Sequence, residues 1–279
     1  MSSDINNHIL RRQYTAHKGD DLLSQVHKVI CIVTPRSFIS AGFHPSGEVL
    51  VVNSSQLDAK HWNSSFIEYE LLNDPLLAAP ELIKSVFVVS TKNIIIPDEL
   101  YSDEANASHW LKSIFHCEAD EKMAVYPFEK SELHISYSFP KCIEEIFSKY
   151  TNDLKILPLN MIHFKNSIAV ENLLQCTISD CFAIATLHHH KKLHWQQTFE
   201  YESPEDIAYK LSSACNHFGV DLLSYPLSVS STSIEHHSTL KKLYHYMPSL
   251  QSKKTGISDL ISPEWSATIH LFQQLYSCE

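Results

Sequence analysis

The order of secondary-structure elements most constrains what this chain can fold into, because the same order is read twice. In each half, runs rich in β-branched and aromatic residues are separated by short turns, which predicts three consecutive antiparallel strands. We expect these strands at residues 28–34, 38–43 and 48–53 in the first half and at 173–179, 181–187 and 193–201 in the second. A helix, a strand and a further helix should follow each set.

Other patterns complete the two halves. The clearest helix start lies in the second half, where Ser203 is followed by Pro204 and two acidic residues. First-half helices are predicted at 63–78 (disturbed near Pro75), after a cap at Ser102 and at 140–150, with strands at 85–90, 123–128, 133–138 and 154–157. Second-half helices are predicted at 159–170, 234–247 and 263–276, with a strand at 225–230 and a short one near Leu250. The Ser102 helix should bury Ala107, Trp110, Leu111, Ile114 and Phe115.

These elements divide the chain into a polar N-terminal arm at residues 1–25, a first lobe at 26–160 and a second lobe at 161–279. Three antiparallel strands followed by alternating helices and strands would form a mixed sheet with helices on its faces. The predicted fold class is therefore α/β, with two ribonuclease H-like lobes around a cleft. Because the connecting segments are short and contain no Ser/Gly linker, we expect packed lobes.

Composition limits the classes of partner. The chain has a formal net charge of -10 and no basic block, whereas nonspecific nucleic-acid binding and attraction to anionic membranes need clustered cations. The N-terminus lacks the pattern of a secretion signal, and no apolar run approaches the ~20 residues that span a bilayer. The seven cysteines form no CxxC pair, which favours reduced thiols. We expect a cytoplasmic protein that binds neither nucleic acid nor membrane.

Three segments carry a resemblance to a known family. They are VFVVSTKNIIIPDELYSDEANASHWL at 86–111, FEYESPEDIAYKLSSACNHFGVD at 199–221 and LYSCE at 275–279. With these, the chain resembles an uncharacterised bacterial family, a domain of unknown function assigned to the actin-like ATPase fold. The resemblance covers nearly the whole chain and implies the fold. It implies no activity, because the family has none established.

The actin-like fold in turn implies where a nucleotide would bind. In actin-like ATPases, glycine-rich turns at the start of each lobe let backbone N–H groups approach the phosphates, and a third such turn holds the adenosine. The corresponding turns here are residues 34–37, 179–181 and 229–232, and none contains glycine. Pro35 also removes a donor from the first turn.

Four side chains in these turns are candidate cofactor-binding residues. Arg36 could grip a phosphate, although an arginine in a hairpin turn is usually only solvated. Asp180 could hold a metal-bound water, but we favour a turn residue that accepts backbone hydrogen bonds. Ser230 and Ser231 are small enough for close contact with an adenosine. We predict no bound cofactor, with ATP and magnesium as the alternative.

Histidine is the other unusual feature, with 18 in the chain. His188, His189, His190 and His194 invite a metal interpretation, because imidazole is a common ligand. Alternation along a strand would separate His189 from its neighbours, and neither HExxH nor a Cys/His zinc spacing occurs. We therefore expect a solvated turn and no metal site. We find no GxSxG, Walker loop or GxGxxG motif, and we assign no catalytic residue.

The leading hypothesis is a non-catalytic or catalytically degraded actin-like protein, a pseudo-ATPase that works by binding another protein. The interlobe cleft or an exposed sheet edge would be its interface. The alternative is an ATP-binding enzyme or nucleotide switch with divergent loops in that cleft.

Overall fold

The structure is a computed structural model that describes residues 9–16, 22–57, 62–128, 132–151, 154–165, 171–247 and 263–278. The chain forms two compact units, Met1–Met161 and Ile162–Glu279, which we call the first and second lobe. None of the described helices combines the length and the hydropathy needed to cross a membrane.

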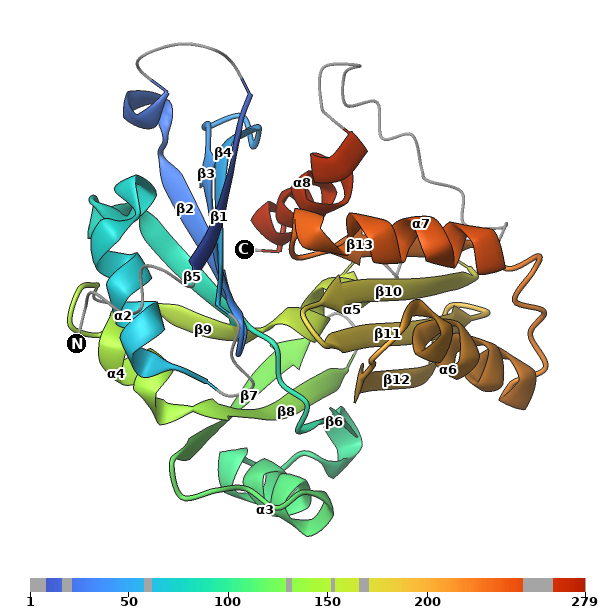
Figure 1. Cartoon of the computed structure of the whole chain (residues 1–279). Coiled ribbons are helices and arrows are strands. Elements are labelled where there is room, and N and C mark those ends of the chain that lie inside the picture. Colours follow the sequence, from blue (N-terminus) through green and yellow to red (C-terminus); the bar gives the residue numbers. More distant parts are fainter. Residues whose placement is uncertain are drawn as a thin grey trace. The chain divides into compact units, whose positions relative to one another are not determined.

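A six-stranded sheet forms the centre of the first lobe (Figure 1). Its strands are β1 (Ile9–Thr15), β2 (Lys28–Val33), β3 (Ser37–Phe43), β4 (Val49–Leu57), β5 (Ile83–Val88) and β9 (Lys155–Pro158). The spatial order is β1-β4-β3-β2-β5-β9, in which β5 and β9 run parallel to their neighbours and the other pairs are antiparallel. The predicted meander is present in β2, β3 and β4.

The polar arm expected at residues 1–25 contains a strand, β1, that was not predicted from the sequence. Ile9–Thr15 pairs antiparallel with β4, although Leu10 and its neighbours through Gln13 are exposed. A short 3-10 helix, η2 (Leu23–Gln25), follows. The side chains of β1 do not alternate between apolar and polar. They contact distant parts of the lobe, as in the ion pair between Arg11 and Glu70. No local pattern reports such partners.

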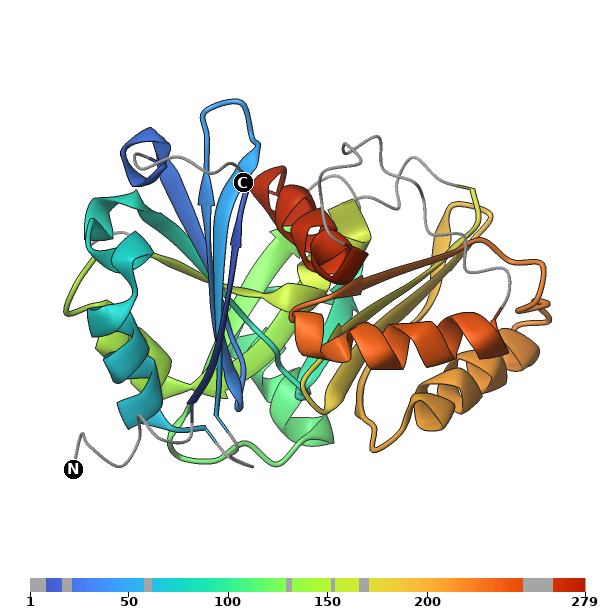
Figure 2. The same ribbon diagram turned by 45° about the horizontal axis from the view of Figure 1, so that its top comes forward.

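Helices α2 (Ser64–Asn73) and α4 (Lys141–Phe147) lie on the same face of the six-stranded sheet (Figures 1 and 2). Asn63 caps α2 through a hydrogen bond from the Phe66 N–H. The helix ends at Asn73, before the predicted end at 78, because proline disfavours helical geometry in the residue before it. Two short 3-10 helices, η3 (Pro75–Leu77) and η4 (Pro80–Leu82), lead into β5.

A second, three-stranded sheet is inserted between β5 and α4. Strands β6 (Asn93–Pro97), β7 (Glu121–Phe128) and β8 (Leu133–Pro140) pair antiparallel in the order β6-β8-β7. The insert also contains η5 (Asp98–Leu100) and α3 (Glu104–Ile114), which contacts all three strands. Neither β6 nor a separate sheet was predicted from the sequence.

Two details of α3 differ from the prediction. The cap is Asp103, whose carboxylate accepts from the Asn106 N–H at 2.7 Å, and not Ser102. The helix buries Ala107 and Leu111, while Trp110 and Ile114 are exposed. The expected apolar face is therefore narrower than the spacing indicated.

The second lobe repeats the core of the first. Strands β10 (Leu173–Ser179), β11 (Phe182–His189), β12 (Lys192–Glu200) and β13 (Leu227–Ser231) form a sheet in the order β12-β11-β10-β13, with β13 parallel to β10. This order corresponds to β4-β3-β2-β5 in the first lobe. The helical elements are η7 (Leu159–Met161), which ends the first lobe, then α5 (Ile162–Lys165), α6 (Pro204–His217), η8 (Ile234–His236), α7 (His237–Tyr246) and α8 (Pro263–Tyr276).

The predicted start of α6 is confirmed in detail. Ser203 and Asp206 form a capping box, and Gly219 follows the helix with a φ of 68°, which favours glycine. Helices α6 and α7 pack against each other, and their buried faces join the sheet in one apolar core (Figure 2). The predicted strand near Leu250 and the end of the predicted helix at 166–170 lie outside the described residues.

Candidate functional site

The first turn that the fold implies as a phosphate site connects β2 to β3. The Thr34 hydroxyl accepts hydrogen bonds from the N–H groups of Arg36 (3.2 Å) and Ser37 (2.7 Å). The Thr34 N–H donates to the Ser37 carbonyl at 2.9 Å. Since Pro35 has no N–H, every backbone donor of residues 34–37 already bonds within the turn. The Arg36 carbonyl also accepts from the Leu57 N–H at 2.7 Å, which holds the turn against the end of β4.

The second turn connects β10 to β11 and contains Asp180. Its backbone has a φ of 41°, and its N–H donates to Nε2 of His236 at 2.9 Å. The Tyr201 hydroxyl donates to the Asp180 carbonyl at 2.8 Å, so both main-chain groups are bonded. His236 accepts this bond only in its neutral form. Burial lowers the pKa of His236, opposed by the charges of Asp180 and Glu235.

The third candidate segment, residues 229–232, spans the end of β13, and Ser230 and Ser231 are the last two residues of that strand. The hydroxyls of Ser230 and Thr177 are 2.8 Å apart, and the Ser231 hydroxyl donates to the Ser233 carbonyl at 2.7 Å. The Thr232 N–H donates to the Ile178 carbonyl at 3.0 Å. All of these residues are buried. The hydroxyl groups of Ser230 and Ser231 therefore form hydrogen bonds within the second lobe.

Ser230 belongs to a buried network around His163 in the second lobe. The two ring nitrogens of His163 lie 2.8 Å from the hydroxyls of Thr177 and Thr186, and Thr177 connects to Ser230. Burial and, to a smaller extent, the neighbouring His188 lower the pKa of His163 to about 3. A neutral imidazole donates from one nitrogen and accepts at the other, which matches two hydroxyl partners. The sequence analysis missed His163, because a lone histidine in a predicted helix carries no signal.

Three histidines of the β11–β12 hairpin lie close together. The rings of His189 and His190 have centroids 4.0 Å apart, and those of His189 and His194 lie 5.6 Å apart. Among the residues that the structure describes, no group of three His, Cys, Asp or Glu side chains is arranged to hold a metal ion. His188 is buried and not solvated as predicted; burial, with a smaller effect of His194, lowers its pKa to about 4.

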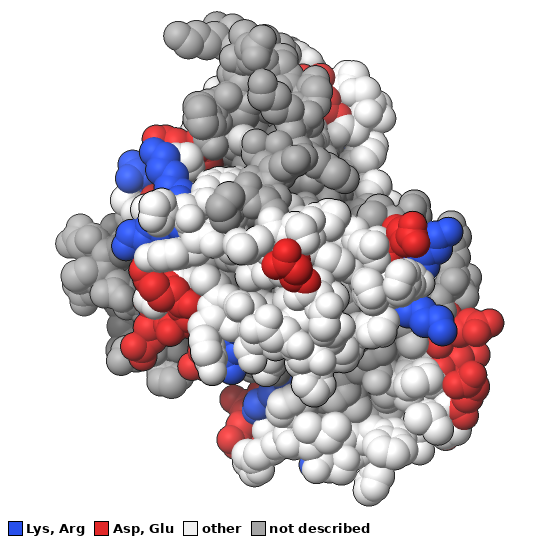
Figure 3. All heavy atoms as spheres, turned by 90° about the vertical axis from the view of Figure 1, so that its right-hand side faces the viewer, with Lys and Arg blue, Asp and Glu red and all other residues white. Residues whose placement is uncertain are grey.

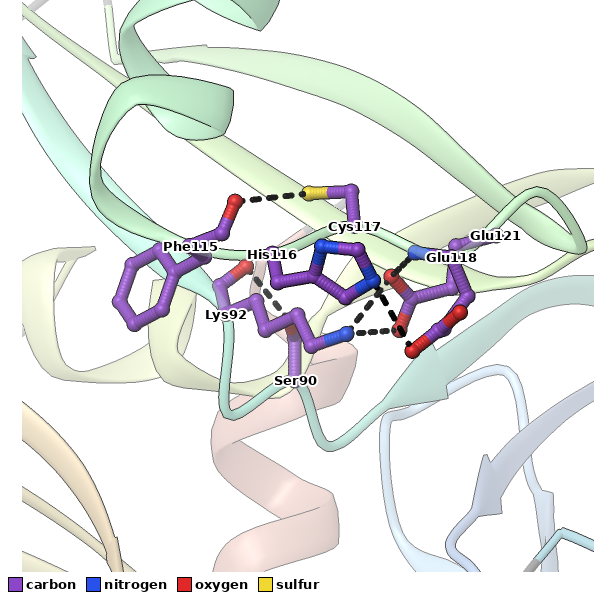
Figure 4. Close-up of polar contacts among 7 residues, drawn as sticks. All are labelled: Ser90, Lys92, Phe115, His116, Cys117, Glu118 and Glu121. Atoms are coloured by element: carbon purple, nitrogen blue, oxygen red, sulfur yellow. Dashed lines mark hydrogen bonds and ion pairs between the residues drawn. The ribbon is translucent and has the colours of Figure 1, made fainter.

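A polar cluster at the base of the insert contains a cysteine, a histidine and two glutamates (Figure 4). Both carboxylate oxygens of Glu121 lie 2.8 Å from the Lys92 ammonium, and one accepts from the Glu118 N–H at 3.0 Å. Burial and the charge of Glu121 raise the pKa of Cys117, opposed by two lysines. At neutral pH, a raised pKa lowers the fraction of the thiol present as the reactive thiolate.

A polar pocket of about 270 Å³ lies in the first lobe, between β1, β4 and the end of α2. Glu70 accepts from Arg11 at 2.9 Å and from the Ser55 hydroxyl at 2.6 Å. Asp74 accepts from the Asn53 amide at 2.6 Å, from the Leu76 N–H at 2.9 Å and from the Ser40 hydroxyl. Burial raises the pKa of Asp74, and these hydrogen bonds oppose the rise. Both carboxylates are buried and bonded, so the network attaches β1 to α2.

The sequence predicted no site role for the residues of this pocket, because Glu70 of α2 meets Arg11 of β1 only through the fold. On the face drawn in Figure 3, lysine and arginine side chains of the described residues are scattered beside acidic ones, and most of the described surface is uncharged. Among the described residues on that face, the lysine and arginine side chains form no continuous patch.

Comparisons with known proteins identify a family and a fold. A family model described as "Protein of unknown function (DUF3822)" matches residues 72–250, more than half of the chain. A comparison with curated proteins finds no match. A Bacteroides thetaiotaomicron protein "with actin-like ATPase fold and unknown function" is 14% identical, with a TM-score of 0.68 over 94% of this chain and 100% of that one. The structure of the "PilM-PilN type IV pilus biogenesis complex" contains a chain that is 9% identical, with a TM-score of 0.53 over 91% and 99%.

Proposed function

The chain belongs to the DUF3822 family of proteins of unknown function and has the actin-like ATPase fold, and we propose that it is a non-catalytic member of that fold which acts by binding another protein. One observation carries the proposal. The turns at which the fold would hold a nucleotide use their own donors internally, through Thr34 in the first lobe and His236 in the second.

The energetic consequence concerns competition. A phosphate could reach the N–H groups of Arg36 and Ser37 only by displacing the Thr34 hydroxyl, and the Asp180 N–H only by displacing His236. Each buried polar group left without a partner costs about 1–3 kcal/mol. Nucleotide binding would have to offset these losses without any glycine to allow closer approach.

Two further observations support the proposal, the first for protein binding and the second for the location of the protein. A protein of similar fold is known in the PilM–PilN complex, although identity of 9% relates the two chains by fold alone. All seven cysteines are free thiols, which agrees with the cytoplasmic location that we include in the proposal.

Calorimetric titration of the full chain with ATP and magnesium tests the proposal. We expect no saturable heat at millimolar nucleotide and no shift of the melting temperature. Tight magnesium-dependent binding, with ATP hydrolysis that is lost in Asp180→Ala, would instead establish the nucleotide-dependent alternative. A second experiment tests protein binding directly. The untagged protein is purified from its native cell, and its complex with any stoichiometric partner is then reconstituted from purified components.

A further inference from the structure

A further pocket of the first lobe is separate from the turns discussed above. Its volume is about 620 Å³, within the range of roughly 300–1,000 Å³ that ligand sites occupy. It lies where the inserted sheet meets α4 and the segment that enters β9. The lining residues are Lys122 and Ala124 of β7, Phe139 of β8, Glu144 of α4, Ser148 just after it, and Thr151, Leu154 and Ile156.

Two strands that border this pocket are the last strands of their sheets. In the described part of the chain, β7 ends the order β6-β8-β7 and β9 ends the order of the six-stranded sheet. Edge strands present main-chain donors and acceptors on their outer side, and extended peptides use such edges. The Tyr137 hydroxyl of the inserted sheet donates a hydrogen bond at 2.7 Å to the Ile156 carbonyl of β9.

The pocket combines apolar contact area with one charge of each sign. Ala124, Phe139, Leu154 and Ile156 supply apolar surface. The Lys122 ammonium lies 2.5 Å from a Glu144 carboxylate oxygen, and the two side chains are 43% and 46% exposed, so the pair is accessible from solvent. A phosphate would be attracted by Lys122 and repelled by Glu144, whereas a metal ion would be attracted by Glu144 and repelled by Lys122. A peptide group offers a carbonyl to Lys122 and an N–H to Glu144.

The wall formed by β7 is already held in place. Glu121, the first residue of the strand, is fixed by the Lys92 ammonium and by the Glu118 N–H (Figure 4). Lys122 follows directly in the chain. A wall that is ordered beforehand reduces the entropy lost on binding.

From this combination we propose that the Lys122–Glu144 pocket binds an extended peptide segment of a protein partner and takes up an apolar side chain of that segment. The inference rests on the proposed function and assigns it a location. The peptide main chain exchanges the Lys122–Glu144 ion pair for hydrogen bonds to both groups. The apolar side chain contacts Phe139, Leu154 and Ile156.

A display library of random dodecapeptides, selected on the full chain, tests the site. We expect enriched peptides to share an apolar residue and to bind with micromolar affinity in a fluorescence polarisation assay. Ala124→Arg places a long cation on the pocket wall and should weaken binding at least tenfold. Ala105→Arg is the matched control, because Ala105 is exposed on α3 of the same lobe, and it should bind as the wild type does.

Ser148→Arg provides a second variant at an exposed position, in case Ala124→Arg unfolds the lobe. Loss of binding in Ser148→Arg with an unchanged melting temperature supports the site. Failure to enrich any peptide, or equal binding by wild type and both pocket variants, overturns it. Binding that depends on a second copy of the chain in sedimentation experiments also overturns it. These outcomes leave the protein-binding proposal standing, because ATP titration and partner reconstitution test that proposal independently.

Discussion

The two lobes share one sheet order but differ in what they bury. Four strands follow β4-β3-β2-β5 in the first lobe and β12-β11-β10-β13 in the second, with the last pair parallel in each. Among the described buried acidic and histidine side chains, the first lobe has two carboxylates and one imidazole (Glu70, Asp74 and His134), whereas the second has three imidazoles and one carboxylate (His163, His188, His236 and Asp180). The strand order therefore fixes the apolar core but leaves the chemistry of the polar interior open.

This difference gives the second lobe a distinct response to acid. The pKa of His163 is about 3 in the folded chain and 6.5 in an ordinary histidine, so the unfolded state binds more protons between these values. The contribution of neutral His163 to the free energy of unfolding is complete above pH 6.5 and decreases as the pH falls toward 3. Asp74, with its raised pKa, has the opposite sign, because protonation favours the folded state.

The largest expected effect belongs to the carboxylate network of the first lobe. Asp74→Ala leaves the Ser40 hydroxyl, the Asn53 amide and the Leu76 N–H without their acceptor, and should lower the free energy of unfolding by about 3 kcal/mol. Urea unfolding at pH 7 measures the loss. Asp74→Asn retains one acceptor oxygen and should lose less. A loss below about 0.5 kcal/mol for Ala would contradict a stabilising role for the network.

Acidification should affect the second lobe next. Between pH 7 and pH 5, burial of neutral His163 should reduce the free energy of unfolding by about 2 kcal/mol. Urea unfolding at both pH values, followed by mass spectrometry of peptides from each lobe, locates the change. In His163→Gln the difference between the two pH values should shrink by that amount. An unchanged difference would mean that His163 is not the responsible group.

The smallest of these effects concerns the α6 cap. Ser203→Ala removes the acceptor for the Asp206 N–H and one half of the capping box, and should cost about 1 kcal/mol. Thermal unfolding measures the loss, with Ser203→Asn expected to restore most of it. If Ser203→Ala left the melting temperature of the second lobe unchanged, the cap would contribute nothing measurable.

Patterns local in sequence predicted much of the fold. The strands of both meanders, the Ser203 start of α6 and the last helix at Pro263–Tyr276 follow from apolar runs, turn residues and caps that lie within a few positions of one another. The prediction of a two-lobed actin-like fold is confirmed by this strand order and by the similar solved structures. The resemblance to a family of unknown function is confirmed by the match at residues 72–250.

Features that depend on distant partners were missed. Strand β1 needs Glu70 on α2, and β6 needs β8, about 40 residues further along the chain. The candidate turns were located from the fold that the resemblance implies, but their closure was not foreseen. Thr34 could have been suspected, because a threonine hydroxyl often bonds backbone groups two and three residues ahead. His236 could not, because it lies 56 residues from Asp180.

The closed turn at Thr34 has a consequence for how the cell could control this protein. In a nucleotide switch, the bound phosphate orders a loop, and the loop reports the ratio of ATP to ADP. Here a hydroxyl of the chain itself supplies the acceptor that a phosphate oxygen would provide, so the turn is ordered as soon as the lobe folds. On the proposed function, binding of the partner would then be insensitive to cellular energy status. Control would act through the amount of protein and of its partner.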